Sequence, residues 1–524
     1  MPDQASVQVL ISMVAYLAAI IVIGVFFMRR ANENSENYFI GGRTLGPWIA
    51  AMSAEASDMS GWLLMGLPGV AYWCGLADAA WTAIGLAIGT YINWLLVAKR
   101  LRRYSIKADN AITIPDFFSK RFKEQEKKPL LLISAAMILI FFAVYTGSCF
   151  VTGGKLFSQL FGLDYKLMMI AGAAVVLFYT LLGGFLAESF SDFIQGVIMI
   201  LALLAVLGCG VAAAGGFGAM FQNLQGFPGF LSFFGIATPN VDASGLQTAT
   251  GGLPDFGPAA PYGILTILST MSWGLGYFGM PQVLLRFVAI RKTSELTRAR
   301  RIATTWCVIA LFAAVFIGLT GRVVFPHTPA LASPAGAESV FILLSQLLFH
   351  PLIAGIIMAG ILAAVMSSSD SYLLIASSAI AKDIFQRAFK RDASEKQVML
   401  VSRATLLLVS LVGILIALDE NSVIFSIVSF AWAGFGAAFG PLVFFSLFWK
   451  RTTHAGAIAG LLTGGGMVFL WKLVLKPMGG VWGIYELLPA FLLACLAIVL
   501  VSLLGKAPSK AIQEEFEAVK ASRD

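Results

Sequence analysis

The chain alternates long apolar stretches with short polar ones over nearly its whole length. Each apolar stretch has about 20 residues or more, which at about 1.5 Å per residue lets a helix cross the hydrocarbon core of a bilayer. We predict thirteen membrane spans, near residues 7–28, 46–73, 76–98, 129–158, 163–183, 190–213, 260–285, 303–325, 346–380, 397–418, 421–447, 455–475 and 484–504. An odd number of spans places the two termini on opposite sides of the membrane.

Composition supports this pattern. The 524 residues are 58% hydrophobic and 12% charged, and the mean hydropathy is +0.84, whereas soluble proteins carry about 25% charged residues. The predicted fold class is therefore an all-α polytopic membrane protein. The five cysteines lack the spacing of disulfide or metal sites, so we expect them to be small core residues.

Lysine and arginine predict the orientation. With the amino terminus outside, the inner loops hold Arg29, Arg30 and Arg43, the group from Lys99 to Lys128, Arg286 to Arg301, Lys382 to Arg403, Lys450 and Arg451, and the tail from Lys506. Of the 36 lysines and arginines, only Lys155, Lys166, Arg322, Lys472 and Lys476 remain outside. The net charge of +8 is therefore a topology signal of the positive-inside kind, and we expect no nucleic-acid partner.

The first interruption of an apolar span covers residues 53–62, Ser-Ala-Glu-Ala-Ser-Asp-Met-Ser-Gly-Trp. An ionised side chain at this depth costs about 3 kcal/mol on insertion scales, so Glu55 and Asp58 should face protein or water. Small hydroxyl residues beside a glycine suit a helix that opens and offers bare carbonyls to an ion. We predict a discontinuous helix here.

A second interruption, Ser272 to Pro281, lies in the seventh span and holds three glycines and a proline within eight residues. Each glycine weakens a helix by about 1 kcal/mol and a proline by about 3. Trp273 and Tyr277 are four residues apart and share a helix face, either as walls of a site or as an interfacial aromatic belt. Spans two and seven open two sets of five spans with opposite directions, as an inverted repeat requires.

A third polar cluster lies in the ninth span. Ala364, Ser367, Ser368 and Ser371 follow helical spacing and form one small, hydroxyl-rich stripe, with Asp370 beside it. The stripe suits either close helix packing or oxygen ligands for a hard cation. Asp192 is a further acid within a span, and either pairing with a nearby cation or backbone group or a functional role would explain it.

The sequence contains no phosphate loop and no nucleophile elbow in a strand-to-helix context, so we expect no enzyme and no cofactor. The match Gly274-x-Gly276-x-x-Gly279 to a dinucleotide fingerprint lies inside a membrane span with no strand before it. The outer loop from Gly215 to Ala259 is either a cap or a connector, and Ala511 to Lys520 predicts a short amphipathic helix.

Five motifs resemble those of the sodium/solute symporter family, and they are most similar to its proline-transporting branch. They are Gly41-Gly42-Arg43, the run from Ser57 to Gly69, the run from Trp273 to Gly279, the run from Ala363 to Ser367, and the run from Ala431 to Pro441. The resemblance covers nearly the whole chain. It implies a leucine-transporter-like fold of five plus five helices with an inverted repeat, broken second and seventh helices, and three flanking helices.

The resemblance also implies the site. Sodium would bind the carbonyls of Ala56, Met59 and Ala364 and the hydroxyls of Ser367 and Ser368. Asp58 would be the acid on which sodium coupling depends. L-Proline would lie against Ser60, Gly61, Trp62, Tyr145, Trp273, Tyr277 and Pro281.

Two residues depart from the family pattern. Glu55 stands where a small residue is expected, and Asp370 replaces a serine, whereas Ser368 for threonine keeps the hydroxyl. Asp370 lies three residues after Ser367, on the same side of the span, and we expect it to face Asp192. In sialic-acid members of the family this neighbourhood forms a second sodium site. The resemblance therefore suggests a further cation or proton site at Asp192, Ser367, Asp370 and Ser371.

The function expected from this resemblance is sodium-coupled import of L-proline by alternating access, in the inner membrane, with the carboxyl terminus cytoplasmic. The alternatives are a sodium- or proton-coupled symporter for another small carboxylate or sugar, a sodium-linked sensor, or a channel. The partners expected are L-proline, Na⁺ and the bilayer, with no transition metal and no obligate protein partner. The expected organisation is residues 1–45 as the first span and inner loop, 46–213 and 260–447 as the repeats, 214–259 as the outer loop, 448–505 as spans twelve and thirteen, and 506–524 as the tail.

Overall fold

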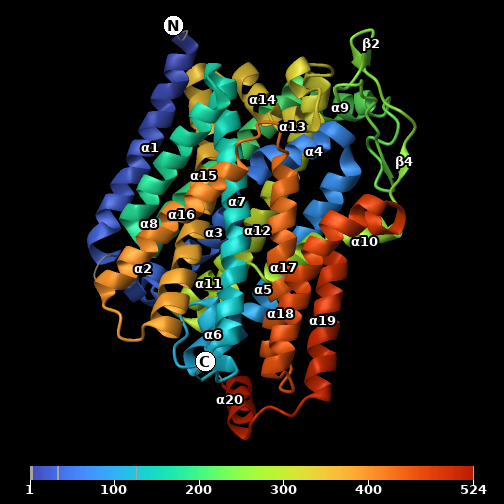
Figure 1. Cartoon of the computed structure of the whole chain (residues 1–524). Coiled ribbons are helices and arrows are strands. Elements are labelled where there is room, and N and C mark those ends of the chain that lie inside the picture. The colour runs from blue at the N-terminus through green and yellow to red at the C-terminus, as the bar shows by residue number, and fades with distance from the viewer. Residues whose placement is uncertain (1–3, 32–34, 126, 523–524) are drawn as a thin grey trace.

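The structure is a computed structural model that describes residues 4–31, 35–125 and 127–522. It is a bundle of long helices lying roughly side by side, with the amino terminus at one end and the carboxy-terminal helix α20 at the other (Figure 1). Within the described residues, ten helices are long and apolar enough to cross a membrane. They correspond to α1 (Gln4–Ala31), α5 (Leu76–Lys107), α7 (Pro129–Phe161), the second part of α8 (Tyr165–Ala213), α12 (Leu296–Val324), α15 (Pro351–Ser378), α16 (Glu395–Ile416), α17 (Ile424–Phe448), α18 (His454–Leu470) and α19 (Leu487–Leu504).

Burial separates the centre of the bundle from its rim. In α15 and α17, 83% of the most apolar window is buried, against 28% in α1 and α19. Helix α1 packs on α8 and α15 at one edge, whereas α18 and α19 pack on each other and on α17 at the opposite edge (Figure 1). A side chain on α15 therefore faces protein on nearly every side, and the polar stripe of this helix lies in the interior.

Two of the predicted spans are interrupted at the polar stretches where the sequence predicts discontinuous helices. The first consists of α3 (Pro47–Asp58), a π-helical turn over Trp62–Gly66 and α4 (Leu67–Cys74), with non-helical backbone at Met59 (φ −82°, ψ 63°). The second consists of α10 (Ile264–Met271), a 3₁₀ turn over Ser272–Phe278 and α11 (Pro281–Ala289). Proline begins α11, where its missing N–H costs no helical hydrogen bond.

Helix α8 comprises two helices that meet at a kink, in the short stretch between the predicted spans 163–183 and 190–213. At the kink Gly184 has φ +58° and ψ −171°, outside the helical region. Glycine adopts this conformation without strain, so the chain can change direction here. Glu188, which follows the kink, lies buried inside the bundle.

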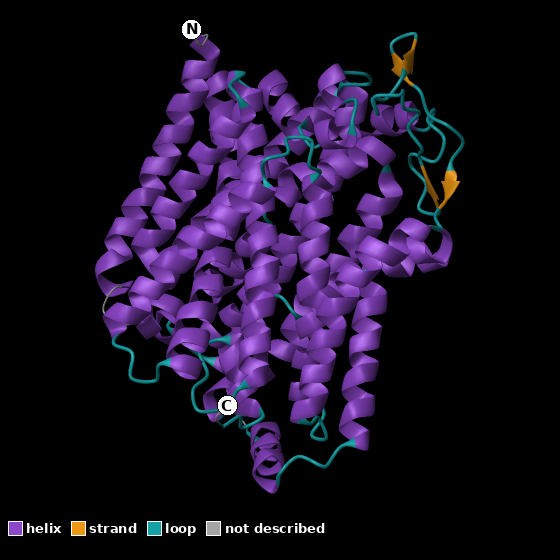
Figure 2. Cartoon of the chain, viewed as in Figure 1, coloured by secondary structure: helices purple, strands orange, loops and turns teal. Residues whose placement is uncertain are grey.

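The outer loop from Gly215 to Ala259 carries its own structure. It contains α9 (Gly216–Leu224) and three of the four short strands, which form the antiparallel pairs β1 (Gly235–Ile236) with β4 (Ala260–Pro261) and β2 (Ala249–Thr250) with β3 (Leu253–Pro254). These strands project from one edge of an otherwise helical molecule (Figure 2). The remaining helices are short: α2 (Ser35–Ile40), α6 (Ile114–Arg121), α13 (Pro334–Ala337) and α14 (Val340–Leu348). Further 3₁₀ or π turns cover Gly41–Arg43, Thr293–Glu295, Pro329–Leu331, Ala379–Phe389, Trp471–Leu475, Lys476–Met478 and Gly480–Gly483.

Contacts between charged and aromatic residues stabilise the end of the bundle that carries α20. The predicted amphipathic tail helix is confirmed as α20 (Lys510–Ala521), whose Phe516 lies under the guanidinium groups of Arg100 and Arg121, at 5.0 and 5.6 Å. In the loop before α7, Glu124 accepts hydrogen bonds from the amides of Leu130 and Leu131 and bonds the His454 ring at 2.7 Å. Burial raises the pKa of Glu124, but these hydrogen bonds outweigh it and hold the pKa below its usual range.

Candidate functional site

The break after α3 frees a backbone carbonyl in the middle of the bundle. In a continuous helix the amide of Ser60 would bond the carbonyl of Ala56, four residues earlier. Here it bonds the carbonyl of Asp58 at 3.0 Å, while the amide of Met59 still bonds Glu55 at 2.8 Å. The carbonyl of Ala56 is thereby available to a partner outside its own helix.

Helix α15 supplies that partner. The Ser367 hydroxyl donates to the carbonyl of Ala56 at 2.8 Å and lies 3.3 Å from the carbonyl of Ala364, and the Ser368 hydroxyl lies 3.5 Å from Ala56. All four residues are fully buried, as is Met59 at the break. The structure thus gathers hydroxyl and carbonyl oxygens from two helices at one buried point, and hard cations bind oxygen ligands of this kind.

Asp58 lies at the end of α3 beside this point. One carboxylate oxygen accepts a hydrogen bond from the Gln282 side chain at 3.3 Å. The other has no hydrogen-bond partner among the described residues, although the side chain is fully buried. Its backbone carbonyl accepts a hydrogen bond from the Tyr145 hydroxyl at 3.4 Å. A buried carboxylate oxygen without a partner is costly unless a cation or proton occupies the space next to it.

Aromatic rings surround the second break. The ring centroids of Trp62 and Trp273 are 5.7 Å apart, and those of Tyr277 and Trp432 are 5.1 Å apart. The Trp432 indole donates to the carbonyl of Trp273 at 2.8 Å, which fixes the backbone of the break. The Phe425 ring lies edge-on to Trp62 and tilted against Trp273, with centroids 6.5 and 5.2 Å away. These rings come from the two interruptions and from α17, and all are buried or nearly so.

The other predicted site residues lie around the same region. The ring of Tyr145, on α7, lies tilted against that of Tyr372 of α15, with centroids 4.4 Å apart, and its hydroxyl contacts the first break. At Gly61 an added Cβ would lie 2.3 Å from the Thr152 side chain, so α7 approaches the break closely only because this residue is glycine. Pro281 begins α11 directly before Gln282, which binds Asp58. Ser60 is buried at the first break.

A second polar cluster centres on Arg286 of α11. Its guanidinium donates to the Ser53 hydroxyl at 2.9 Å, to Asp192 at 3.2 Å and to the Ser371 hydroxyl at 2.9 Å, and it forms an ion pair with Glu188. It also donates to the Gln282 carbonyl at 3.2 Å. Four elements, α3, α8, α11 and α15, therefore meet at one buried guanidinium.

Asp370 lies next to this cluster. One of its carboxylate oxygens accepts a hydrogen bond from the Ser371 amide at 2.8 Å, and the other has no partner among the described residues. Glu188 and Asp192 pair with the Arg286 guanidinium, and Asp370 is buried beside this pair, so the three ionised carboxylates would leave an excess of negative charge. Ser367, which we grouped with Asp192 and Asp370, instead directs its hydroxyl to Ala56.

The sequence analysis missed several residues of both clusters. We placed Arg286 in an inner loop, which is wrong: its side chain is fully buried. Gln282 and Trp432 were also not predicted as site residues. A signal was available for Arg286 and Gln282, because they are four apart and share a face of the helix that follows the second break. Glu188 was not considered, because it lies between the predicted spans 163–183 and 190–213.

The geometry can be compared with known proteins. The profile of the sodium:solute symporter family matches residues 38–464, most of the chain and both interruptions. The chain belongs to the sodium:solute symporter family. Proteins of this family are transporters, with sodium as the coupling ion, and they are not enzymes.

Curated relatives of this symporter chain match almost from end to end. The "Sodium/proline symporter" of Escherichia coli (strain K12) is 42% identical over 519 residues, covering 98% of this chain and 97% of the relative. The "Osmoregulated proline transporter OpuE" of Bacillus subtilis (strain 168) is 40% identical over 512 residues, with 98% of each chain covered. Both are named for proline.

Among solved structures, a Na⁺-coupled sialic acid symporter in a substrate-bound outward-open state aligns with a TM-score of 0.74, covering 96% of this chain and 99% of the other. Its sequence is only 19% identical, so the likeness concerns the fold. The symporter chain is thus a mostly helical, multi-pass membrane protein with a transporter fold.

Proposed function

We propose that this chain is a sodium-coupled secondary active symporter that imports L-proline by alternating access. The observation that carries the proposal is the Ala56 carbonyl, released from its helix and met by the Ser367 hydroxyl at 2.8 Å beside the buried carboxylate of Asp58. The names of the curated relatives support proline as the substrate.

The sodium ion would bind between the first break and α15. Its ligands are the carbonyls of Ala56, Met59 and Ala364 and the hydroxyls of Ser367 and Ser368. The Ser367 hydroxyl hydrogen now points at Ala56, and a small rotation would turn its lone pairs toward a cation without moving the backbone. Asp58 would balance the charge of the ion. Because Asp58 ends α3, sodium binding would also act on the backbone of the first break.

Proline would bind between the two breaks, against Ser60, Gly61, Trp62, Tyr145, Trp273, Tyr277 and Pro281. Trp62, Trp273 and Tyr277 offer apolar faces for the pyrrolidine ring, and backbone amides at the start of the helix after the first break suit its carboxylate. All these residues are buried, so the site in this structure is closed to solvent and release requires a rearrangement.

The membrane arrangement we propose has thirteen spans, with the two interrupted spans counted as one each. Residues 46–213 and 260–447 form the two inverted repeats of five, residues 1–45 and 448–505 supply the flanking spans, and residues 214–259 form the outer loop. The amino terminus lies outside and the tail, 506–524, lies in the cytoplasm, in the inner membrane. The charge bias of the loops supports this orientation.

The energetics of one-to-one coupling are sufficient for accumulation. One charge moving through 100 mV supplies about 2.3 kcal/mol, and a tenfold sodium gradient adds about 1.4 kcal/mol. The sum of about 3.7 kcal/mol sustains an approximately 500-fold accumulation of a neutral solute.

A second coupling site is favoured by the charge of the Arg286 cluster. Two carboxylates pair with one guanidinium there and the third, Asp370, is buried nearby, so a further cation or proton at Asp192, Asp370 and Ser371, next to Ser367, would balance the charge. In Asp370→Asn we expect a changed sodium Hill coefficient or pH profile of uptake. If both match those of the wild type, the second site is absent.

The proposed function is tested by uptake of radiolabelled proline into proteoliposomes under inward gradients of sodium, lithium or protons imposed separately. We expect uptake that requires sodium and is lost in Asp58→Asn. The exposed Asp109, also replaced by Asn, is the matched control and should retain uptake, because its side chain is 93% exposed. No proline uptake under any gradient would refute the substrate, and uptake without sodium would refute the coupling.

A further inference from the structure

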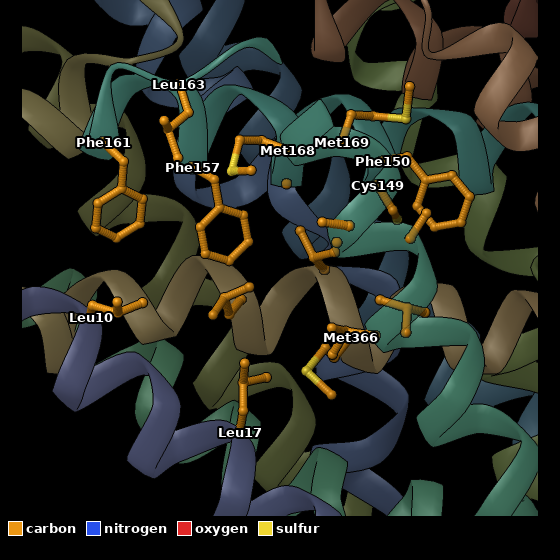
Figure 3. Close-up of a pocket in the computed structure, with 18 of the residues that line it drawn as sticks. Leu10, Leu17, Cys149, Phe150, Phe157, Phe161, Leu163, Met168, Met169 and Met366 are labelled. Carbon is orange, nitrogen blue, oxygen red and sulfur yellow. The ribbon is translucent and has the colours of Figure 1, made fainter. Parts of the chain in front are cut away.

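An apolar crevice lies behind the sodium-site helix, on the side away from the two breaks. It has a volume of about 580 Å³ and is bounded by α1, α7, the first part of α8 and α15. Figure 3 shows Phe157, Phe161, Met168 and Met366 directed into it. The volume falls in the range of about 300–1,000 Å³ that is usual for small-molecule pockets.

The crevice spans about one leaflet of a bilayer. Along α1 it reaches from Val7 to Leu17, ten residues or about 15 Å. The hydrocarbon core is about 30 Å thick, so this depth is about half of it. The crevice begins near Leu163, in the turn between α7 and α8 at the amino-terminal end of the bundle, and ends at Met366 near the middle of α15.

The chemistry of the crevice suits only an apolar occupant. None of its lining residues carries a charge, and aliphatic, aromatic and sulfur-containing side chains dominate. At its rim, Val7, Leu10 and Leu163 are 42–48% exposed, and in a membrane these side chains face acyl chains. The crevice is therefore continuous with the lipid-facing surface of α1 and α8. Lys166, one helical turn after Leu163, is exposed, so a lipid phosphate group can approach it.

The crevice is not closed by the protein itself. Gly153, on α7, is buried and lines the crevice, yet a Cβ added there would meet no atom within 4 Å. An unfilled space of this size would forfeit the dispersion contacts of its walls.

We propose that the crevice holds one acyl chain of a phospholipid from the leaflet on the amino-terminal side. The chain lies between α1 and α7, with its end against Val365 and Met366. These two residues directly precede Ser367, so the bound lipid supports the back of the helix that carries the proposed sodium ligands. This lipid site is separate from the proline and sodium sites and does not depend on the identity of the transported solute.

The test fills the crevice without touching the breaks. The full chain, as wild type, Gly153→Leu and Gly208→Leu, is reconstituted in nanodiscs that contain a phospholipid with a photoreactive diazirine near the acyl terminus. Gly208 is the matched control, because it also lies on a membrane helix and an added Cβ meets no atom within 4 Å, but it is exposed on the outer surface. Labelled peptides are identified by mass spectrometry after irradiation.

We expect labelling on the crevice walls of α7 and α15 in the wild type and in Gly208→Leu, and at least a fivefold loss in Gly153→Leu, with labelling of α19 unchanged. Equal labelling of the walls in all three proteins would overturn the proposal. If Gly153→Leu does not fold, Gly172→Leu fills the same crevice, since its Cβ meets only Phe157, at 3.9 Å.

Discussion

Replacing Arg286 by methionine removes the only guanidinium of the buried cluster while keeping a long side chain. The change leaves the carboxylates of Glu188 and Asp192 without their cationic partner, in a part of the bundle that excludes water. It also removes hydrogen bonds to the Ser53 and Ser371 hydroxyls, at 2.9 Å each.

The expected loss of stability is large. Removing one partner of a buried ion pair costs about 3–5 kcal/mol, because an uncompensated charge remains. A hydrogen bond to a charged group is worth about 1.5–3 kcal/mol, so the two hydroxyl contacts add to this figure. The same network joins α3, α8, α11 and α15, and we therefore expect proline transport to fall with stability.

The assay is equilibrium unfolding in mixed micelles, followed by exposure of the buried thiols of Cys149 and Cys307. Arg286→Met should unfold at markedly lower denaturant. Arg291→Met is the control, because this arginine is 55% exposed in its pair with Glu295 and should have little effect.

A rescue experiment separates charge from packing. If the unpaired charge causes the loss, Arg286→Met combined with Glu188→Gln should recover about 0.5–3 kcal/mol relative to the sum of the two single variants. Strictly additive losses would refute the reasoning and show that the guanidinium acts through its contacts alone.

Three further outcomes are expected. Gly276→Ala should abolish uptake and cost about 1–3 kcal/mol of stability, because its Cβ would lie 1.9 Å from the buried indole nitrogen of Trp432. Gly466→Ala is the control and should behave as wild type, since its Cβ would meet no atom within 4 Å. Ser367→Ala should weaken the apparent sodium affinity of uptake at least tenfold, whereas Ser369→Ala, whose hydroxyl bonds only its own helix, should not; equal effects would contradict the ligand assignment. Glu124→Gln should lower the melting temperature at neutral pH. Because the pKa of Glu124 is lowered in the folded state, the ionised carboxylate stabilises the wild type above the usual carboxyl pKa. The difference in melting temperature between the variant and the wild type should therefore persist above that pKa and shrink as the pH falls below it.

The two breaks were predictable because their signal is local. Glycine, serine and carboxylate residues within an apolar run oppose a continuous lipid-facing helix wherever they occur, and the structure interrupts the helices at Met59 and at Ser272–Phe278. The shared face of Ala364, Ser367 and Ser368 likewise followed from helical spacing alone.

The Arg286 cluster was not predictable in the same way. Arg286 lies near the end of an apolar run, where charge counting assigns it to a loop, and its burial depends on carboxylates that come from α8. Glu188 follows the kink at Gly184, between two predicted spans, and its burial depends on tertiary packing against Arg286, which no local pattern indicates. Similarly, Trp432 meets the second break through tertiary packing of α17.

The most direct test of sodium–proline coupling is the reverse flux. Proteoliposomes without a sodium gradient receive an inward gradient of proline, and entry of radiolabelled sodium is measured. We predict that the proline gradient drives net sodium entry in the wild type, although no sodium gradient is imposed, and fails to do so in Asp58→Asn and Ser367→Ala. Proline entry with no accompanying sodium would contradict the account, since the site between α3 and α15 would then not couple the two solutes.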